Sequence, residues 1–230
     1  MTDGPDSDRL DHIETWVFDL DNTLYPAKCN LFKQVDRRIG AFITDLLGVD
    51  AHEARRIQKA YFLSHGTTLR GLMDVHRVDP EAFLTYVHDI DLREVPPSAA
   101  LEAVLAKIGG RKLVFTNGTA EHAERVLDRL GVSHHFDGIF DIVDADYVPK
   151  PYLDAYRALF AHHQVDPRRA AMIEDIAKNL IPAAALGMTT IWVRTDSAWA
   201  REGADGDHIH HVVDDLVDWL EALAARRRRG

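Results

Sequence analysis

The pattern of apolar and polar positions divides the chain into two kinds of region. From residue 98 onward, short apolar runs alternate with amphipathic segments, which is typical of alternating strands and helices. The runs predicted as strands are Lys112–Thr116, Gly138–Val143, Ala170–Ile173 and Thr189–Val193. The segments predicted as helices are Thr119–Gly131, Tyr152–His163, Ile176–Leu186 and Val212–Ala225. With a further apolar run before residue 19, this alternation predicts an α/β fold, a Rossmann-like parallel sheet with helices on both faces.

Residues 27–95 follow a different pattern, in which apolar residues from Leu31 to Leu47 recur at helical spacing and Gly48 offers a stop. Further helices are predicted at Ala51–Ser64 and at Asp79–His88, and no strand is predicted in this region. We therefore expect residues 14–26 and 96–230 to form an α/β core. Residues 27–95 are expected to form a helical cap inserted after the first strand, and residues 1–13 a flexible leader.

Composition narrows the possible partners and locations. The 230 residues are 46% hydrophobic, which is ample for a packed core, and the net charge is −10. An acidic balance disfavours general binding to nucleic acid or to anionic membranes, both of which need positive surface. Cys29 is the only cysteine, so no intrachain disulfide can form, and no apolar segment resembles a signal peptide or a membrane span. We expect a cytoplasmic protein; its oligomeric state is not determined by the sequence.

Two carboxylates follow the first predicted strand. The apolar run that ends at Phe18 leads directly into Asp19 and Asp21, and side chains two apart on a strand point to the same face. Open parallel sheets place their ligands at the carboxyl ends of strands. Carboxylates this close repel each other unless a cation lies between them or they divide the roles of nucleophile and acid. The alternative is an aspartate-rich turn whose side chains bond local backbone N–H groups.

Three later strand ends also carry polar residues. Thr116-Asn117-Gly118 offers a hydroxyl and open N–H groups that suit a phosphate, and Lys150 is held between two prolines. Glu174-Asp175 offers oxygen ligands to a hard cation such as Mg²⁺. Taken singly, these residues could be a turn cap, a solvated lysine and helix N-terminal acids. Their common position at one sheet edge instead favours phosphoryl transfer through an aspartyl-phosphate, which needs a nucleophile, a hydroxyl, a cation and metal ligands.

Four segments, Phe18 to Tyr25, Thr116-Asn117-Gly118, Lys150-Pro151 and Glu174 to Leu180, resemble the ordered motifs of the haloacid dehalogenase superfamily. This resemblance covers residues 14–200. It implies that Asp19 is the nucleophile and a metal ligand, and that Asp21 is the general acid/base whose backbone carbonyl also reaches Mg²⁺. It further implies phosphate binding by Thr116, Asn117 and Lys150, and a metal site completed by Glu174 and Asp175. The chain departs from many relatives at Asn179, where they carry a second acidic residue.

A narrower resemblance concerns the substrate. Asp21 to Tyr25, together with Tyr61 to Leu72 in the predicted cap, is similar to the pyrimidine 5′-nucleotidase branch. It implies a Mg²⁺-dependent phosphatase acting on a small phosphorylated metabolite, UMP or CMP. His65, Thr67 and Arg70 are then candidate substrate contacts, since Gly66 and Gly71 allow tight turns around them. The alternative is that this segment only packs the interior of the cap.

Three other functions compete with this prediction. The first is a phosphatase for another small metabolite, such as phosphoglycolate or a sugar phosphate. The second is a 2-haloacid dehalogenase, which Asp21 disfavours because halide displacement needs neither a proton donor nor Mg²⁺. The third is a non-catalytic binding protein, which the joint presence of all four motifs disfavours. Adjacent histidines such as His134-His135 and His162-His163 are expected to be solvated, because neighbours in sequence seldom face one ligand.

Overall fold

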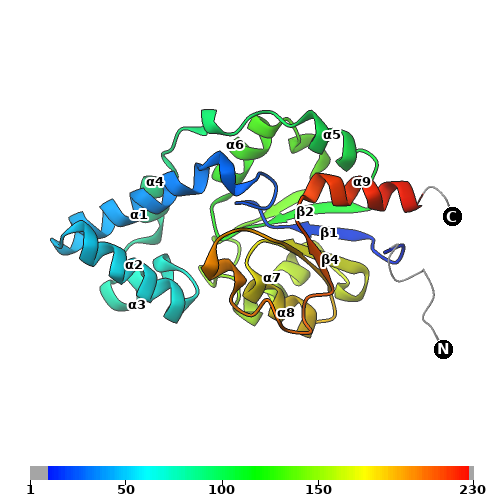
Figure 1. The fold of residues 1–230 in the computed structure, drawn as a ribbon. Coiled ribbons are helices and arrows are strands. Elements are labelled where there is room, and N and C mark those ends of the chain that lie inside the picture. The colour runs from blue at the N-terminus through cyan, green and yellow to red at the C-terminus, as the bar shows by residue number, and fades with distance from the viewer. Residues whose placement is uncertain (1–9, 228–230) are drawn as a thin grey trace.

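The computed structural model describes residues 10–227 and shows an α/β fold. Six parallel strands form one sheet in the order β3-β2-β1-β4-β5-β6, and helices cover both of its faces (Figure 1). This confirms the predicted fold class. The leader expected at residues 1–13 lies mostly outside the described residues. Leu10 and Ile13, which are described, are buried in the core.

The elements of the sheet layer agree with the predicted alternation. The strands are β1 (Thr15–Phe18), β2 (Arg111–Phe115), β3 (Gly138–Phe140), β4 (Ala170–Glu174), β5 (Thr189–Val193) and β6 (His211–Val213). The helices are α5 (Ala99–Leu105), α6 (Ala120–Leu130), α7 (Leu153–His163), α8 (Leu180–Ala185) and α9 (Leu216–Arg227). Short 3₁₀ helices include η3 (Ser133–His135), η5 (Ala177–Asn179) and η6 (Ala198–Arg201). Between residues 10 and 227, no helix is both long and apolar enough to cross a membrane.

The central position of β1 is what brings the predicted motifs together. Phe18 lies opposite Val114 of β2 on one side and Ile173 of β4 on the other. The residues that follow each strand therefore emerge side by side at the carboxyl edge of the sheet. The strand residues Trp16, Val17 and Phe18 are completely buried, as expected for a parallel sheet covered on both faces.

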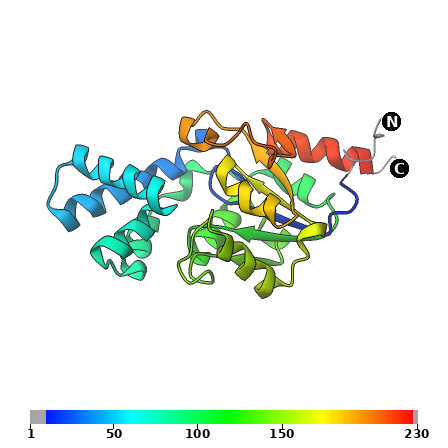
Figure 2. The same cartoon turned by 90° about the horizontal axis from the view of Figure 1, so that it is seen from below.

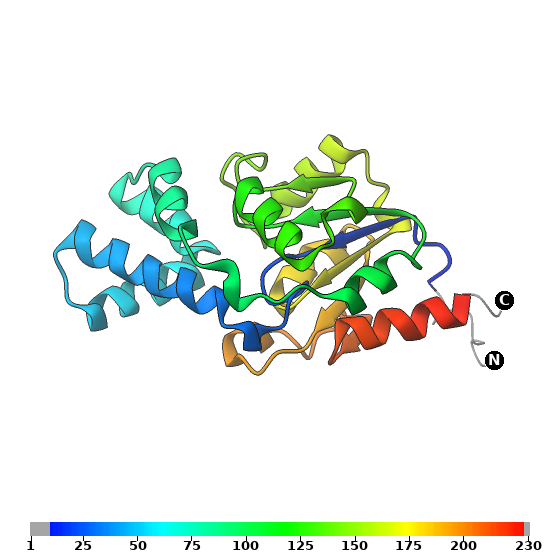
Figure 3. The ribbon, with the colours of Figure 1, turned by 90° about the horizontal axis from the view of Figure 1, so that it is seen from above.

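Four helices form a separate group beyond this edge of the sheet (Figures 2 and 3). They are α1 (Leu31–Leu47), α2 (Ala51–His65), α3 (Thr68–His76) and α4 (Pro80–His88). α1 ends at Gly48, whose φ of 64° lies in the left-handed region that favours glycine. Phe42 of α1 packs edge-to-face on Phe83 of α4, at 5.0 Å between ring centroids. These four helices lie within residues 27–95, the segment predicted to be helical. That residues 27–95 form a cap with these boundaries remains a proposal.

Helix α3 was not predicted, and the expected turn at Gly71 is wrong. Gly71 lies inside α3, where a Cβ would come within 2.5 Å of Tyr61, so glycine is needed there for close helix packing. The predicted helix Ile176–Leu186 is divided into η5 and α8. Pro182 explains the late start of α8, because proline has no N–H and fits only the first turn of a helix.

The end of the chain also differs from the prediction. Residues His211–Val213, part of which was predicted as the start of the last helix, pair with β5 as the edge strand β6. α9 begins only after Asp215, whose side chain accepts hydrogen bonds from the N–H groups of Val217 and Asp218. Helix α5 was not predicted either; it is capped by Ser98, whose hydroxyl accepts from the N–H of Leu101.

Candidate active site

Lys150 joins three segments at the carboxyl edge of the sheet. Its ammonium donates to Oδ1 of Asp19 at 2.7 Å, to Oε2 of Glu174 at 2.7 Å and to the carbonyl of Phe115 at 2.8 Å. The lysine is only 1% exposed. The backbone N–H of Asp19 also donates to the carbonyl of Ile173 at 2.9 Å, which fixes the position of the carboxylate relative to β4. The structure therefore brings the first, third and fourth motifs into direct contact.

The carboxylates at this edge carry more negative charge than Lys150 balances. Burial raises the pKa of Asp19 to about 7, and repulsion from Glu174 adds to the shift although Lys150 opposes it. Burial also raises the pKa of Asp175, with further repulsion from Glu174 and Asp19. Burial alone would lower the pKa of Lys150, but Asp19 and Glu174 raise it above its usual value, so the lysine stays charged.

This arrangement fits a divalent metal ion. Asp19, Glu174 and Asp175 are buried, and one carboxylate oxygen from each lies within 4.8 Å of the others. Oxygen donors of this kind are what Mg²⁺ prefers, and a carboxylate that accepts one hydrogen bond keeps lone pairs for a cation. The pKa values of Asp19 and Asp175 are raised because burial and mutual repulsion outweigh the charge of Lys150, so a further positive charge would be favourable here. Both the donor set and the electrostatics thus suit Mg²⁺.

The carboxylate of Asp21 lies apart from this cluster and has partners that the sequence analysis missed. Its Oδ1 accepts a hydrogen bond from the hydroxyl of Tyr25 and lies 3.3 Å from Nε2 of His122. His122 stacks on His88, the last residue of α4, at 4.5 Å between ring centroids. Burial alone would raise the pKa of Asp21, but His122 and Tyr25 lower it overall. The spacing of four residues between Asp21 and Tyr25 was the one signal in the sequence for this contact.

The second motif separates into two structural roles. The hydroxyl of Thr116 is buried and accepts from the N–H of Gly118 at 2.9 Å. The side-chain oxygen of Asn117 accepts from the N–H of Lys150 at 2.8 Å, and its amide donates to the Lys150 carbonyl at 3.3 Å. The side chain of Asn117 therefore holds the Lys150 loop, so a contact between Asn117 and a phosphoryl group would have to use its backbone N–H.

A cavity of about 660 Å³ lies over these groups, between the sheet edge and the four-helix group. Its floor includes Asp19, Asp21, Thr116, Lys150, Glu174 and Asp175. Phenylalanine and tryptophan rings in its lining come from Phe32, Phe62, Phe83 and Trp199, and Phe62 packs edge-to-face on Trp199 at 5.6 Å between ring centroids. Lys33, Arg37 and Lys59 also line it and are exposed. A small substrate could therefore contact the sheet edge and the helical group together.

The three predicted substrate contacts from the helical group have different positions. Thr67 lines the cavity and also caps α3, since its hydroxyl accepts from the N–H of Arg70. His65 and Arg70 are not among the lining residues. His65 contacts Ser64 and packs edge-on to Tyr61, while Arg70 pairs with Asp74 one turn along α3 at 2.9 Å. Because α3 begins directly after Thr67, Arg70 lies along the surface of this helix beside Asp74; a substrate contact by His65 or Arg70 stays a prediction.

Comparisons with known proteins agree with this geometry. Residues 13–187 match the family model for haloacid dehalogenase-like hydrolases. Phosphate metabolism protein 8 from Saccharomyces cerevisiae is 26% identical over 200 residues, which cover 80% of this chain and 62% of the yeast protein. The chain thus spans less than two thirds of that relative. Enolase-phosphatase E1 from Frankia alni is 28% identical over 211 residues, covering 78% of this chain and 85% of that protein.

A solved structure shows the same fold. The HAD-hydrolase YfnB from Bacillus subtilis, solved with bound magnesium, superposes with a TM-score of 0.61 over 92% of this chain and 98% of that one, at 12% sequence identity. At this identity the likeness concerns the fold alone. The family match extends from the first strand through α8 and includes all four strand-end motifs. The chain therefore belongs to the haloacid dehalogenase-like hydrolases.

Proposed function

We propose that this hydrolase is a Mg²⁺-dependent phosphomonoesterase that acts through an aspartyl-phosphate on Asp19. The observation that carries the proposal is the contact of Lys150 with both Asp19 and Glu174, at 2.7 Å each, beside the buried hydroxyl of Thr116. A carboxylate nucleophile beside a fixed cation and a hydroxyl is suited to a phosphoryl group. The names of the yeast and Frankia relatives refer to phosphate metabolism and to a phosphatase, which supports this assignment.

In the first step, an oxygen of Asp19 attacks phosphorus and the bond from phosphorus to the leaving oxygen breaks. Asp21 donates a proton to that oxygen. In the second step, water attacks phosphorus, Asp21 takes its proton, and the bond from phosphorus to Asp19 breaks. The lowered pKa of Asp21 suits the second step, in which it acts as a base. A nearby phosphoryl dianion raises the pKa of a carboxylate by like-charge repulsion, which favours the acid form needed first.

Charge compensation comes from both the chain and the metal site. The hydroxyl of Thr116 can donate a hydrogen bond to a phosphoryl oxygen, and the charge of the Lys150 ammonium offsets negative charge there, while Asn117 keeps the Lys150 loop in place. Asp19, Asp175 and the backbone carbonyl of Asp21 would hold Mg²⁺, with Glu174 in support. When bound, the ion would offset the negative charge on the phosphoryl oxygens. The magnesium in the structure of YfnB supports this choice of ion.

The proposed substrate is a pyrimidine nucleoside 5′-monophosphate, UMP or CMP. The rings of Phe32, Phe62 and Trp199 in the cavity suit a flat base, because aromatic groups pack face-to-edge or in offset stacks. The exposed cations Lys33, Arg37 and Lys59 attract an anionic substrate toward the cavity. The sequence resemblance to pyrimidine 5′-nucleotidases points the same way. A cytoplasmic location is part of this proposal, in keeping with a single cysteine.

A panel of substrates tests the proposal. Phosphate release by the purified full chain with Mg²⁺ is measured on UMP, CMP, AMP, phosphoglycolate and sugar phosphates, and halide release on 2-chloropropionate. We expect the highest kcat/KM for UMP or CMP. A higher value for another ester would revise the substrate but leave the chemistry intact. Halide release without phosphate release would establish dehalogenase chemistry instead, and no release of either would favour a binding protein.

A further inference from the structure

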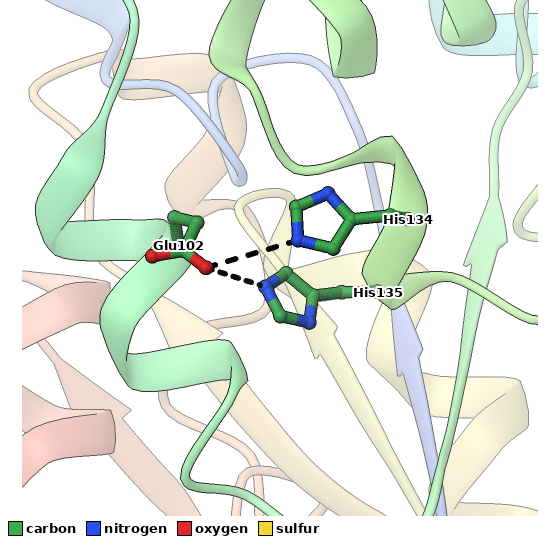
Figure 4. Close-up of side chains that lie close together, drawn as sticks. All are labelled: Glu102, His134 and His135. Atoms are coloured by element: carbon green, nitrogen blue, oxygen red, sulfur yellow. Dashed lines mark ion pairs between the residues drawn. The ribbon is translucent and has the colours of Figure 1, made fainter.

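A second group of side chains that could hold a metal ion lies outside the active site. Nε2 of His134 is 3.7 Å from Oε1 of Glu102, and Nε2 of His135 is 3.4 Å from the same oxygen (Figure 4). The three ligand atoms all lie within 4.8 Å of one another. The two imidazole rings are tilted by 40° with centroids 4.1 Å apart. Contrary to the expectation for neighbours in sequence, both histidines therefore face one carboxylate.

This cluster is remote from the carboxyl edge of the sheet. Its histidines lie on η3, which leads into the amino end of β3, and Glu102 lies on α5, away from α1 to α3 in Figure 1. The backbone supports the approach of the two segments. The N–H of Ser98, at the start of α5, donates to the carbonyl of Leu130 at 3.0 Å, and the N–H of His135 donates to the carbonyl of Val132 at 3.0 Å. An ion bound here would link α5 to the segment between α6 and β3, which contains η3.

The chemistry of the three side chains selects the kind of ion. Two imidazoles and one carboxylate suit Zn²⁺ far better than Mg²⁺, which prefers an all-oxygen octahedral set. Ligand atoms about 2.0–2.2 Å from a tetrahedral Zn²⁺ are about 3.4 Å from one another, close to the two distances from Glu102. The His134 side chain is 61% exposed, so its ring can rotate to complete the geometry.

His135 provides an independent indication. Its side chain is only 13% exposed, and its Nε2 is shielded from solvent without a hydrogen bond to any atom of residues 10–227. Burying an imidazole nitrogen without a hydrogen bond lowers the stability of the fold, unless a ligand binds that nitrogen. An ordinary surface ion pair with Glu102 would gain little and would not need both rings to converge. We propose that Glu102, His134 and His135 form a Zn²⁺ site with one open coordination position, distinct from the Mg²⁺ site.

Zinc titration of the intact chain tests this proposal. The protein is stripped with chelator, dialysed and kept in excess Mg²⁺, so that the active-site carboxylates are occupied, and Zn²⁺ binding is then followed by calorimetry. Co²⁺ absorption gives a second readout, because tetrahedral and octahedral sites differ in intensity. The variants Glu102→Gln and His134→Ala change side chains that are 43% and 61% exposed, so both should fold. His162→Ala is the matched control, since it removes a histidine from another adjacent pair, outside both clusters that could hold a metal.

We expect one Zn²⁺ per chain in the wild type and in His162→Ala. Glu102→Gln and His134→Ala should weaken this binding at least as much as the loss of an outer-shell partner does, about 10–100-fold. Zn²⁺ should raise the Tm of the wild type but not of these two variants, while all four proteins unfold alike in chelator. Asp175→Asn should keep the Zn²⁺ site and lose the Mg²⁺ site. Absence of Zn²⁺ binding in excess Mg²⁺, or binding unchanged in Glu102→Gln and His134→Ala, would overturn the proposal.

Discussion

His122 lies 3.3 Å from Asp21, although 101 positions separate the two residues in the chain. His122 is in the first turn of α6, which follows β2, and β2 pairs with the strand that precedes Asp21. Its ring also stacks on His88, at the end of α4. Tyr25 and His122 thus contact the same Oδ1 of the proposed acid/base, which is linked through ring stacking to the four-helix group.

Replacing His122 with Asn should impair proton donation by Asp21, because His122 lies 3.3 Å from its carboxylate and helps to position it. The accompanying rise in the pKa of Asp21 favours the acid form but does not restore that positioning. We expect single-turnover phosphorylation to fall about 10-fold for UMP, a part of the usual contribution of general acid catalysis, and less for p-nitrophenyl phosphate. The difference arises because a nitrophenolate leaves without protonation. Tyr25→Phe removes the other donor to Asp21 and should show the same dependence on the leaving group. Equal losses on the two esters would mean that His122 has only a packing role.

Asp19→Asn should abolish turnover while the protein remains folded. An amide cannot attack phosphorus or bind Mg²⁺ as a carboxylate does, so kcat should fall by at least about 10³-fold, as when other catalytic nucleophiles are removed. The fold should survive, because the raised pKa of Asp19 shows that its charge is unfavourable in the metal-free state. The measurements are phosphate release and thermal unfolding in chelator. Substantial residual turnover would show that another residue is the nucleophile.

Mg²⁺ should stabilise the protein more strongly at high pH. The pKa of Asp19 rises from its usual value of 3.8 to about 7 on folding. The protonated carboxyl of Asp19 therefore adds fully to the free energy of unfolding below about pH 4, and this contribution is lost as the pH rises through about 7. Since Mg²⁺ binds the carboxylate, the rise in Tm caused by Mg²⁺ should grow from about pH 5 to about pH 8. Asp19→Asn should reduce the pH dependence of this rise in Tm. If the pH dependence is unchanged in the variant, it arises from other titrating groups.

Removal of the metal should stop the reaction reversibly. We expect activity to be lost in chelator, to return with Mg²⁺ and not to return with Ca²⁺. Mg²⁺ enforces a compact octahedral geometry, whereas Ca²⁺ takes more ligands at longer distances and would displace the nucleophile. Phosphate release from UMP is the measurement. Full activity in chelator would contradict the metal-dependent mechanism and favour dehalogenase-like chemistry.

The cavity wall should decide substrate preference. Phe62→Ala removes a cavity-lining ring that packs on Trp199, and we expect kcat/KM to fall about 10-fold for UMP. The effect on p-nitrophenyl phosphate, which has no base or ribose, should be smaller. Arg70→Ala is the control, because Arg70 pairs with Asp74 and is not among the cavity-lining residues. A uniform effect of Phe62→Ala on both substrates would indicate packing of the helical group only.

Local chemistry made much of the architecture predictable from the sequence. Apolar runs ending in polar residues marked strands β1, β2, β4 and β5, and the stops at Gly48 and Gly131 marked the ends of α1 and α6. Helices α3 and α5 escaped prediction because they are short, with nine and seven residues, and because Gly71 in α3 resembled a turn residue. β6 escaped because three residues become a strand only when β5 offers an edge with which to pair.

The sequence by itself determined which chemical groups follow each strand, because residue type and strand ends are local properties. Only the tertiary structure decided how these groups meet. The order of the strands places Asp19 between the ends of β2 and β4, where Lys150 reaches both Asp19 and Glu174. The same long-range packing brings His122 to Asp21 and Glu102 to two histidines. Such contacts depend on burial and on strand pairing over long separations, and no local pattern in the sequence records them.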